Sequence, residues 1–485
     1  MLKRFIIALA LVVLAGFRAN AADTQLQQIA DALDVSTTKT FQFTANGKMW
    51  AVGEASSPMA ANPRSYIKSL TRSYDFTAGA MREELVRSQG EAPPSGGDYQ
   101  PIEGDQRLVA FVRGDFAWYE AGKSMNPAPE EANERAHAIV ISPHGLVRAA
   151  FANNATVTKK TIEGREMTVV SFAVQGKHKV VAYVNDQNAI EKVESSYGHP
   201  VVGDMKVVTY YGPYRDFGGI KFPAKIIQYQ DGLPSLDVTV TAIRTNPTVD
   251  IEVPSNVRSE PVTVKSEKVA DGVWFIGGGT HNSVLIEMKD YLIVVEAPLG
   301  DLRSTAVMGE VKKLVANKPI KYLVNTHHHV DHSGGVRAYA AEGVTIVTHE
   351  LSRPYYEKAL ASTWNLSPDR LVKSKKRPVF QTMGDNMVLT DGARSVELYQ
   401  IIGSGHHDGM VMAYLRKEKL LVEADVFSPF GIPKTPNPYS VNLEANVRRL
   451  NIDVDKILPI HGSIVPYVEL MKAIGKGPAE KAPAK

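Results

Sequence analysis

The chain has 485 residues, 44% of them hydrophobic, and a formal net charge of +3 at pH 7. Its length predicts more than one domain, and its apolar content is that of an ordinary globular protein. No basic block stands out, so the charge pattern gives no support to binding of nucleic acid or of an anionic membrane surface. The chain has no cysteine, which excludes disulfides.

Residues 1–21 have the pattern of a secretory signal peptide. Lys3 and Arg4 precede an apolar run, residues 5–17, that is too short to span a bilayer comfortably, and residues 19–21 form a small-x-small cleavage site. An uncleaved anchor is the alternative. Lys3, Arg4 and Arg18 account for the net charge, so the remainder carries 52 basic and 52 acidic residues. We expect a periplasmic or secreted protein with no stable membrane insertion after cleavage.

Strand and turn signals dominate residues 22–258, which we predict to form an antiparallel β-rich domain. After a short amphipathic helix over residues 24–33, Asn46-Gly47 predicts a hairpin between strands at 40–44 and 48–52. Gly79 and Gly114 mark two further hairpins. Residues 89–105, rich in Pro, Gly and acidic side chains, predict a surface loop, and residues 130–152 a helical interruption.

Short strands recur from Thr156 to Ile243, which predicts an antiparallel meander that is curved or partly closed. Residues 210–212 and 217–223 loosely resemble the open-barrel lipoprotein carriers of the periplasm. That resemblance implies an open barrel able to hold an apolar ligand. The alternative is a sheet that only packs against the second domain.

A Pro-marked linker at residues 246–256 leads to a second domain, residues 259–474. Strands alternate with helices there, including a helix predicted over residues 303–316 and a short buried strand over residues 320–324. Residues 352–376 form a basic, mostly helical insertion with Tyr355, Tyr356 and Trp364. Residues 475–485, rich in Pro, Ala and Lys, predict a disordered tail.

Four imidazoles and one carboxylate follow the 320–324 strand within six residues, as His327-His328-His329-Val330-Asp331-His332. A helix predicted over residues 336–342 and closed by Gly343 places this run in a loop at the carboxyl end of the strand, where functional groups collect. Imidazole nitrogen and carboxylate oxygen are ligands for zinc and similar divalent metals. An adventitious histidine-rich loop is the alternative.

The spacing His-x-His-x-Asp-His resembles the signature of the metallo-β-lactamase-fold hydrolases. The further ligand positions of that family follow in order at His406, Asp425 and His461, each after a predicted strand. The resemblance implies an αββα sandwich behind the β-rich domain, and hence an α+β protein. It also implies that His327, His329 and His406 hold one metal, that Asp331, His332 and His461 hold another, and that Asp425 bridges the two.

The same resemblance implies a binuclear hydrolase, with two zinc ions per chain and iron or manganese as alternatives. A metal-bound hydroxide would attack the carbonyl of a small, apolar ester, lactone or related substrate. Asp331 and His332 are the catalytic candidates. A β-lactamase is one alternative, although the missing cysteine and the presence of Asp425 disfavour it. A periplasmic carrier with a structural metal domain is another. The sequence does not predict an oligomeric state.

Two residues depart from the family pattern. Glu296 stands where many relatives carry Asp. Ala424 stands where many relatives carry Gly, just before the bridging Asp. By strand periodicity Glu423 and Asp425 share one face, so we expect Glu423 to approach the metals or to hydrogen-bond to their ligands, unless solvent satisfies it at the strand end. Among the other histidines, we predict supporting contacts for His328 and His407, and either a supporting or a structural role for His349. We leave His281 outside the ligand set.

Overall fold

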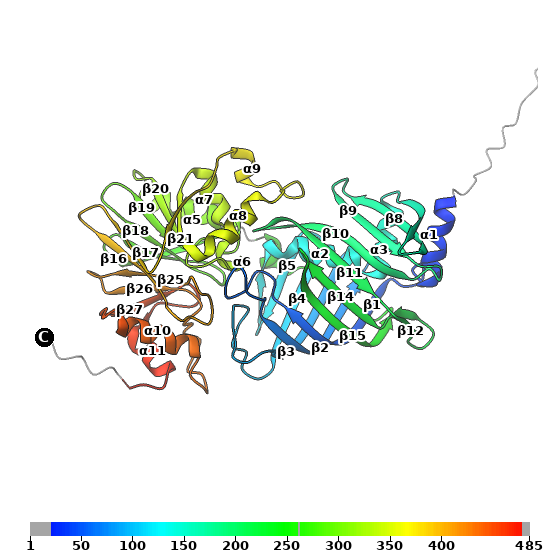
Figure 1. The fold of residues 1–485 in the computed structure, drawn as a ribbon, viewed down its shortest axis with the longest axis horizontal. Helices are drawn as coiled ribbons and strands as arrows, with labels where there is room; N and C mark the ends of the chain where they lie inside the picture. Colours follow the sequence, from blue (N-terminus) through cyan, green and yellow to red (C-terminus); the bar gives the residue numbers. More distant parts are fainter. Residues whose placement is uncertain (1–20, 260–261, 478–485) are drawn as a thin grey trace, which may run out of the picture.

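The computed structural model describes residues 21–259 and 262–477. The expected signal peptide, apart from residue 21, and residues 478–485 of the expected tail lie outside the described residues. Within the described ranges, no helix is long and apolar enough to cross a membrane. Figure 1 shows the β-rich N-terminal region on one side and two stacked sheets with flanking helices on the other.

One antiparallel sheet of 13 strands forms the N-terminal region, in the order β6-β5-β4-β3-β2-β1-β15-β14-β11-β10-β9-β8-β7. Its edge strands β6 and β7 do not pair with each other, so the sheet is open and not a closed barrel. The strands are Thr40–Trp50 (β1), Arg64–Asp75 (β2), Ala80–Gln89 (β3), Gln106–Arg113 (β4), Phe116–Ala121 (β5), Ser124–Pro127 (β6), Thr156–Ile162 (β7), Arg165–Val174 (β8), His178–Val184 (β9), Ile190–His199 (β10), Gly203–Tyr211 (β11), Lys225–Gln230 (β14) and Leu233–Thr245 (β15); Tyr214–Asp216 (β12) and Lys221–Pro223 (β13) form a separate pair.

Helices pack against one face of this sheet and close its core. They are Ala21–Ala32 (α1), Ala132–Ile141 (α2) and Pro143–Ala152 (α3), with a short 3-10 turn at Pro129–Glu131 (η1). Helix Ser255–Ser259 (α4), which follows the sheet, packs in a separate cluster in which Val257 joins Val109 and Trp118. Phe41, Leu146 and Val238 are buried in this core. A cavity of only about 20 Å³ lies there, against several hundred Å³ for a typical ligand pocket.

The hairpin predicted at Asn46-Gly47 is wrong. Strand β1 runs without a turn through these residues and pairs with β15 and β2 on its two sides, with register shifts at Ala45 and Gly47. A Cβ at Gly47 would lie 2.1 Å from the carbonyl oxygen of Asp237. The glycine therefore permits close approach of two strands in a bulge, because pairing on both sides overrides the local turn preference.

The C-terminal region is an αββα sandwich of two sheets with helices on both outer faces (Figure 1). The first sheet consists of Lys265–Ala270 (β16), Val273–Gly277 (β17), Ser283–Glu287 (β18), Leu292–Val295 (β19), Ile320–Val324 (β20), Thr345–His349 (β21) and Val379–Met383 (β22); the second of Asn386–Thr390 (β23), Ser395–Gln400 (β24), Val411–Leu415 (β25), Leu420–Glu423 (β26), Lys456–Pro459 (β27) and Val465–Pro466 (β28). The helices are Asp301–Leu314 (α5), Val330–Ser333 (α6), Val336–Glu342 (α7), Arg353–Ala361 (α8), Arg370–Ser374 (α9), Pro438–Arg449 (α10) and Tyr467–Ala473 (α11), with a 3-10 turn at Glu350–Ser352 (η2).

The direction of the strands brings distant loops together. Strands β19 to β22 are parallel, as are β26 and β27. Loops that follow parallel strands leave the same edge of a sheet. The loop after β20 carries the histidine run, and those after β26 and β27 carry Asp425 and His461. The two sheets pack through a shared core that includes Val295, Val411 and Leu421, so their loop-bearing edges meet.

The insertion at residues 352–376 docks onto the N-terminal region. The Asp204 carboxylate, on β11, accepts hydrogen bonds from the backbone N–H groups of Asn365 and Leu366 at 3.0 and 2.9 Å. Trp364 is buried beneath the Arg337 guanidinium, whose central carbon lies 3.7 Å from the centre of one of its rings. The insertion contains α8 and α9 but is irregular between them. Because Asn365 and Leu366 donate to Asp204 of the N-terminal region, the insertion links the two regions.

Candidate metal centre

Seven side chains predicted as metal ligands meet where the loops after β20, β26 and β27 converge with the loop between β24 and β25. The seven are His327, His329, Asp331, His332, His406, Asp425 and His461. They belong to two adjoining groups of donor atoms, each spanning less than 4.8 Å. Parts of the chain more than 130 residues apart thus supply one compact cluster.

The first group consists of His327, His329, His406 and Asp425. Nε2 of His327 lies 3.0 Å from Nδ1 of His329 and 3.2 Å from Nε2 of His406. Oδ2 of Asp425 lies 3.2 Å from Nε2 of both His327 and His406. Ring nitrogens this close are poorly matched as hydrogen-bond partners of one another unless one carries a proton. Their convergence with a carboxylate matches the donor set of a divalent cation.

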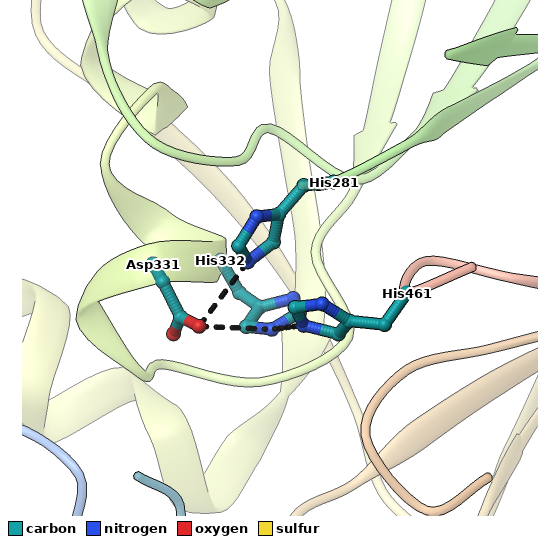
Figure 2. Close-up of side chains that lie close together, drawn as sticks. All are labelled: His281, Asp331, His332 and His461. Carbon is teal, nitrogen blue, oxygen red and sulfur yellow. Dashed lines mark hydrogen bonds and ion pairs between the residues drawn. The ribbon is translucent and has the colours of Figure 1, made fainter. Parts of the chain in front are cut away.

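The second group consists of His281, Asp331, His332 and His461, which Figure 2 shows converging from three segments: Asp331 and His332 lie on α6, His281 between β17 and β18, and His461 after β27. Nε2 of His332 lies 3.2 Å from Nε2 of His461 and 3.6 Å from Oδ2 of Asp331. Nε2 of His281 is 3.2 Å from that same oxygen. Asp425 reaches this group as well, with Oδ2 2.7 Å from His332 and Oδ1 2.8 Å from His461. Its carboxylate therefore lies between the two groups.

Hydrogen bonds behind the rings fix which nitrogen faces the cluster. Thr326 Oγ1 donates to Oε2 of Glu296 at 2.5 Å and lies 2.9 Å from Nδ1 of His327, so that ring nitrogen donates to the hydroxyl. Nδ1 of His332 donates to Oε2 of Glu296 at 3.1 Å. The Nε2 atoms of both rings are thereby directed at the cluster, and partners of this kind orient metal-binding histidines.

The electrostatics of the two groups differ. Burial, reinforced by neighbouring imidazoles, lowers the pKa values of His327 and His329 well below the ordinary value, so both rings are neutral at pH 7. Burial also opposes a proton on His332, but the carboxylates of Asp425 and Asp331 raise its pKa well above the ordinary value. A proton and a metal cation on the same nitrogen exclude each other, so metal binding at His332 would release a proton.

Comparison with known proteins identifies the C-terminal region. Residues 276–461, which include all seven predicted ligands, match the family model described as the metallo-beta-lactamase superfamily. The C-terminal region belongs to that superfamily. The resemblance seen in the sequence is thereby confirmed, together with the α+β fold.

Individual proteins match over part of the chain only. The α subunit of 2,4-dinitroanisole O-demethylase from Nocardioides sp. (strain JS1661) is 26% identical over 206 residues, which are 41% of this chain and 58% of that protein. The chain thus spans about three-fifths of the length of this relative. A metallo-beta-lactamase from Pontibacter korlensis (18% identity, TM-score 0.36) aligns over 44% of this chain and 98% of its own. One from Hirschia baltica (18% identity, TM-score 0.35) aligns over 44% and 97%.

Three side chains at this site, one imidazole and two carboxylates, were not predicted from the sequence or were interpreted incorrectly. His281, left outside the ligand set, belongs to the second group. Glu423 is fully buried, so solvent does not satisfy it, and burial followed by the charge of Asp425 raises its pKa well above the ordinary value. Strand β26 ends at Glu423 and Asp425 has φ +59°, so strand periodicity does not extend to Asp425. Glu423 nevertheless lies near the centre, since the charges of Asp425 and His332 both act on its pKa.

The third is Glu54, which comes from the N-terminal region. It is buried, and its Oε2 lies 3.5 Å from Nδ1 of His329. Residues 90–105 form the predicted loop, but that loop is not only a surface feature. Gly97 lies so close to the centre that an added Cβ would be 2.8 Å from Nδ1 of His329. No local sequence signal indicates these contacts.

His328, His349 and His407 are the remaining histidines of the C-terminal region. Nδ1 of His328 lies 2.6 Å from Nε2 of His407, and both side chains are buried beside the cluster. His349, at the end of β21, accepts a hydrogen bond from the N–H of Leu351 at 3.1 Å and thereby caps η2. His349 thus has a structural role, one of the two predicted for it.

Proposed function

We propose that the protein is a metal-dependent hydrolase that holds two divalent cations, with zinc as the expected metal. The position of Asp425 carries this proposal, because one carboxylate contacts ring nitrogens of both donor groups. A bridging carboxylate helps to neutralise two adjacent dications. The family match supports a hydrolase and leaves the substrate open.

Bound cations would lower the pKa of a water molecule toward 7 and polarise an acyl oxygen. We propose Asp331 as the residue that moves protons. Its side chain is 38% exposed, whereas the Asp425 side chain is 14% exposed. Oδ2 of Asp331 contacts His281, and Oδ1 has no hydrogen-bond partner within the described part of the chain. Asp331 can therefore take a proton from the attacking water and pass it to the leaving group.

We propose esters or lactones with an apolar acyl part as substrates. Among the aromatic residues of the 352–376 insertion, Tyr356 and Trp364 are buried in packing, and Tyr355 is half-buried with its ring 4.3 Å from that of His328. Phe430 lies on the loop after Asp425 and is 78% exposed, and it lies against Gly462, which follows His461. An exposed aromatic ring beside the centre favours an apolar substrate.

A substrate panel tests this proposal. The metal-loaded protein should hydrolyse lactones and aryl esters with higher kcat/KM than a cephalosporin. The likeness to an O-demethylase subunit favours an aryl methyl ether as a second candidate, so 2,4-dinitroanisole belongs in the panel. Phe430→Ala should lower kcat/KM for long acyl chains by roughly tenfold and for acetyl esters much less, since each methylene contributes about 1–3 kcal/mol. A cephalosporin or the aryl ether as the best substrate would overturn the ester assignment.

A further inference from the structure

The N-terminal segment 53–56 lies directly on the loop that carries the histidine run. Each of its residues approaches the C-terminal region. A Cβ at Gly53 would lie 2.5 Å from the side chain of Val330. Ser56 accepts a hydrogen bond through its carbonyl from the N–H of Asp408 at 2.7 Å. Asp408 lies two residues after His406, so segment 53–56 contacts the loops of two predicted ligands.

Ala55 determines the orientation of one of those ligands. Nε2 of His329 lies 2.9 Å from the carbonyl oxygen of Ala55. A carbonyl only accepts hydrogen bonds, so Nε2 of His329 carries the proton. Nδ1 is left with a free lone pair directed at His327 and Asp425. The N-terminal region thus selects the ring nitrogen that His329 offers to a cation, a role that elsewhere in this site belongs to Glu296 and Thr326.

Glu54 adds a carboxylate on the metal-facing side of the same ring. Its Oε1 accepts a hydrogen bond from the N–H of Val330 at 3.2 Å, and its Oε2 lies 3.5 Å from Nδ1 of His329. No Lys or Arg of the described residues forms an ion pair with Glu54. A buried carboxylate without a cationic partner is costly, and a cation held by His329 would supply the missing charge.

Gly97 shows how closely this corner is packed. A Cβ there would lie 2.3 Å from Oε2 of Glu54 and 2.8 Å from Nδ1 of His329. The N–H of Gly97 donates to the backbone carbonyl of Glu54 at 2.9 Å. The loop at residues 90–105 therefore packs against Glu54 and His329. It leaves no space for a side chain larger than glycine at position 97.

We propose that Glu54 is a positioning carboxylate of the metal centre, through which the N-terminal region tunes the site formed by His327, His329 and His406. The inference rests on the proposed metal-dependent function and adds a residue from outside the superfamily region. It predicts that the charge of Glu54, and not only its shape, raises the affinity of that one site. The site formed by His281, Asp331, His332 and His461 should be far less sensitive.

The test uses the full chain and Zn²⁺ alone as the probe, with competition against a chromophoric chelator to obtain both dissociation constants. Glu54→Gln keeps the shape and an oxygen that can accept from Val330, but removes the charge. We expect the dissociation constant of one site to rise roughly 10–100-fold, as for other residues that support ligands, while the other changes little. Co²⁺ substitution should show an altered absorption spectrum for that one site. Glu54→Ala should lose more affinity, and Glu103→Ala, an exposed acid of the 90–105 loop, should lose none.

The outcomes separate the two proposals. Wild-type protein that binds no Zn²⁺ would overturn both. Wild-type protein that binds two Zn²⁺, with unchanged affinities and Co²⁺ spectrum in Glu54→Gln, would overturn the role of Glu54 and leave the proposed function intact. If Glu54→Ala does not fold, Glu54→Gln decides, because it keeps the size of the side chain and an oxygen that can accept from the N–H of Val330.

Discussion

Asp425 contacts His327 and His406 of the first group and His332 and His461 of the second. Burial raises its pKa, but the surrounding imidazoles lower it well below the ordinary value. The carboxylate therefore stays ionised at neutral pH. Asp425 occupies a left-handed backbone position with φ +59°, which turns its side chain away from the line of β26 and between the two groups.

His144 permits a residue-scale prediction far from the metal centre. It is buried in the N-terminal core, with its ring 4.5 Å from that of Phe41, and burial lowers its pKa from 6.5 to about 4. At a pH between about 4 and 6.5, the His144 side chain is protonated in the unfolded chain but not in the folded protein. Stability from His144 is therefore fully present above pH 6.5 and is lost as the pH falls toward 4, by about 3 kcal/mol in all. Urea unfolding across this range should show a flatter pH dependence for His144→Gln than for the wild type, and equal slopes would contradict this assignment.

At the scale of elements, local patterns predicted many strands and helices but not every connection. The predicted strand at residues 320–324 and helix at residues 336–342 match β20 and α7, because both are short, strongly patterned and bounded by clear breakers. The histidine run in the loop between them was proposed as a metal site from residue spacing. The hairpin predicted at Asn46-Gly47 is wrong because the turn preference of these two residues is local, whereas the strand pairing that overrides it comes from β15, nearly 200 residues away.

Gly47 gives the element-scale prediction. In Gly47→Ala, the new methyl group would meet the carbonyl of Asp237, so β1 and β15 must separate. We expect a loss of about 2 kcal/mol or more in the free energy of unfolding. Gly79→Ala is the matched control, since Gly79 has φ +59° and open space around it and should lose only about 1 kcal/mol to backbone strain. Equal losses in denaturant unfolding would show that the bulge does not depend on close approach.

At the scale of the whole molecule, the contacts between the two regions could not be predicted from the sequence. Ala55 and His329 are 274 residues apart, and Glu54 stands in no recognisable motif. His281 likewise follows β17 without a spacing that links it to the histidine run. The sequence could predict ligands that share a local signature or a position after a strand. It could not predict residues that reach the centre only because separate folding units dock against each other.

Export is a further property of the whole chain, and we propose it from residues 1–21. Cleavage after Ala21 should leave a protein that begins at Ala22 and remains in solution without detergent. Intact-mass spectrometry of the protein expressed in a bacterium with its native N-terminus measures this directly. A chain that retains Met1 and sediments with membranes would contradict the proposal, whereas a control with Lys3 and Arg4 changed to Ala should be exported less efficiently.

The metal content of the purified chain tests the central claim most directly. Elemental analysis after loading with Zn²⁺ and removal of the excess should give two metal ions per chain for the wild type. Asp425→Asn, which keeps the size of the bridging side chain but removes its charge, should give fewer than two and bind the remainder more weakly, while the far-UV circular dichroism stays unchanged. One ion or none per wild-type chain would contradict the two-metal centre.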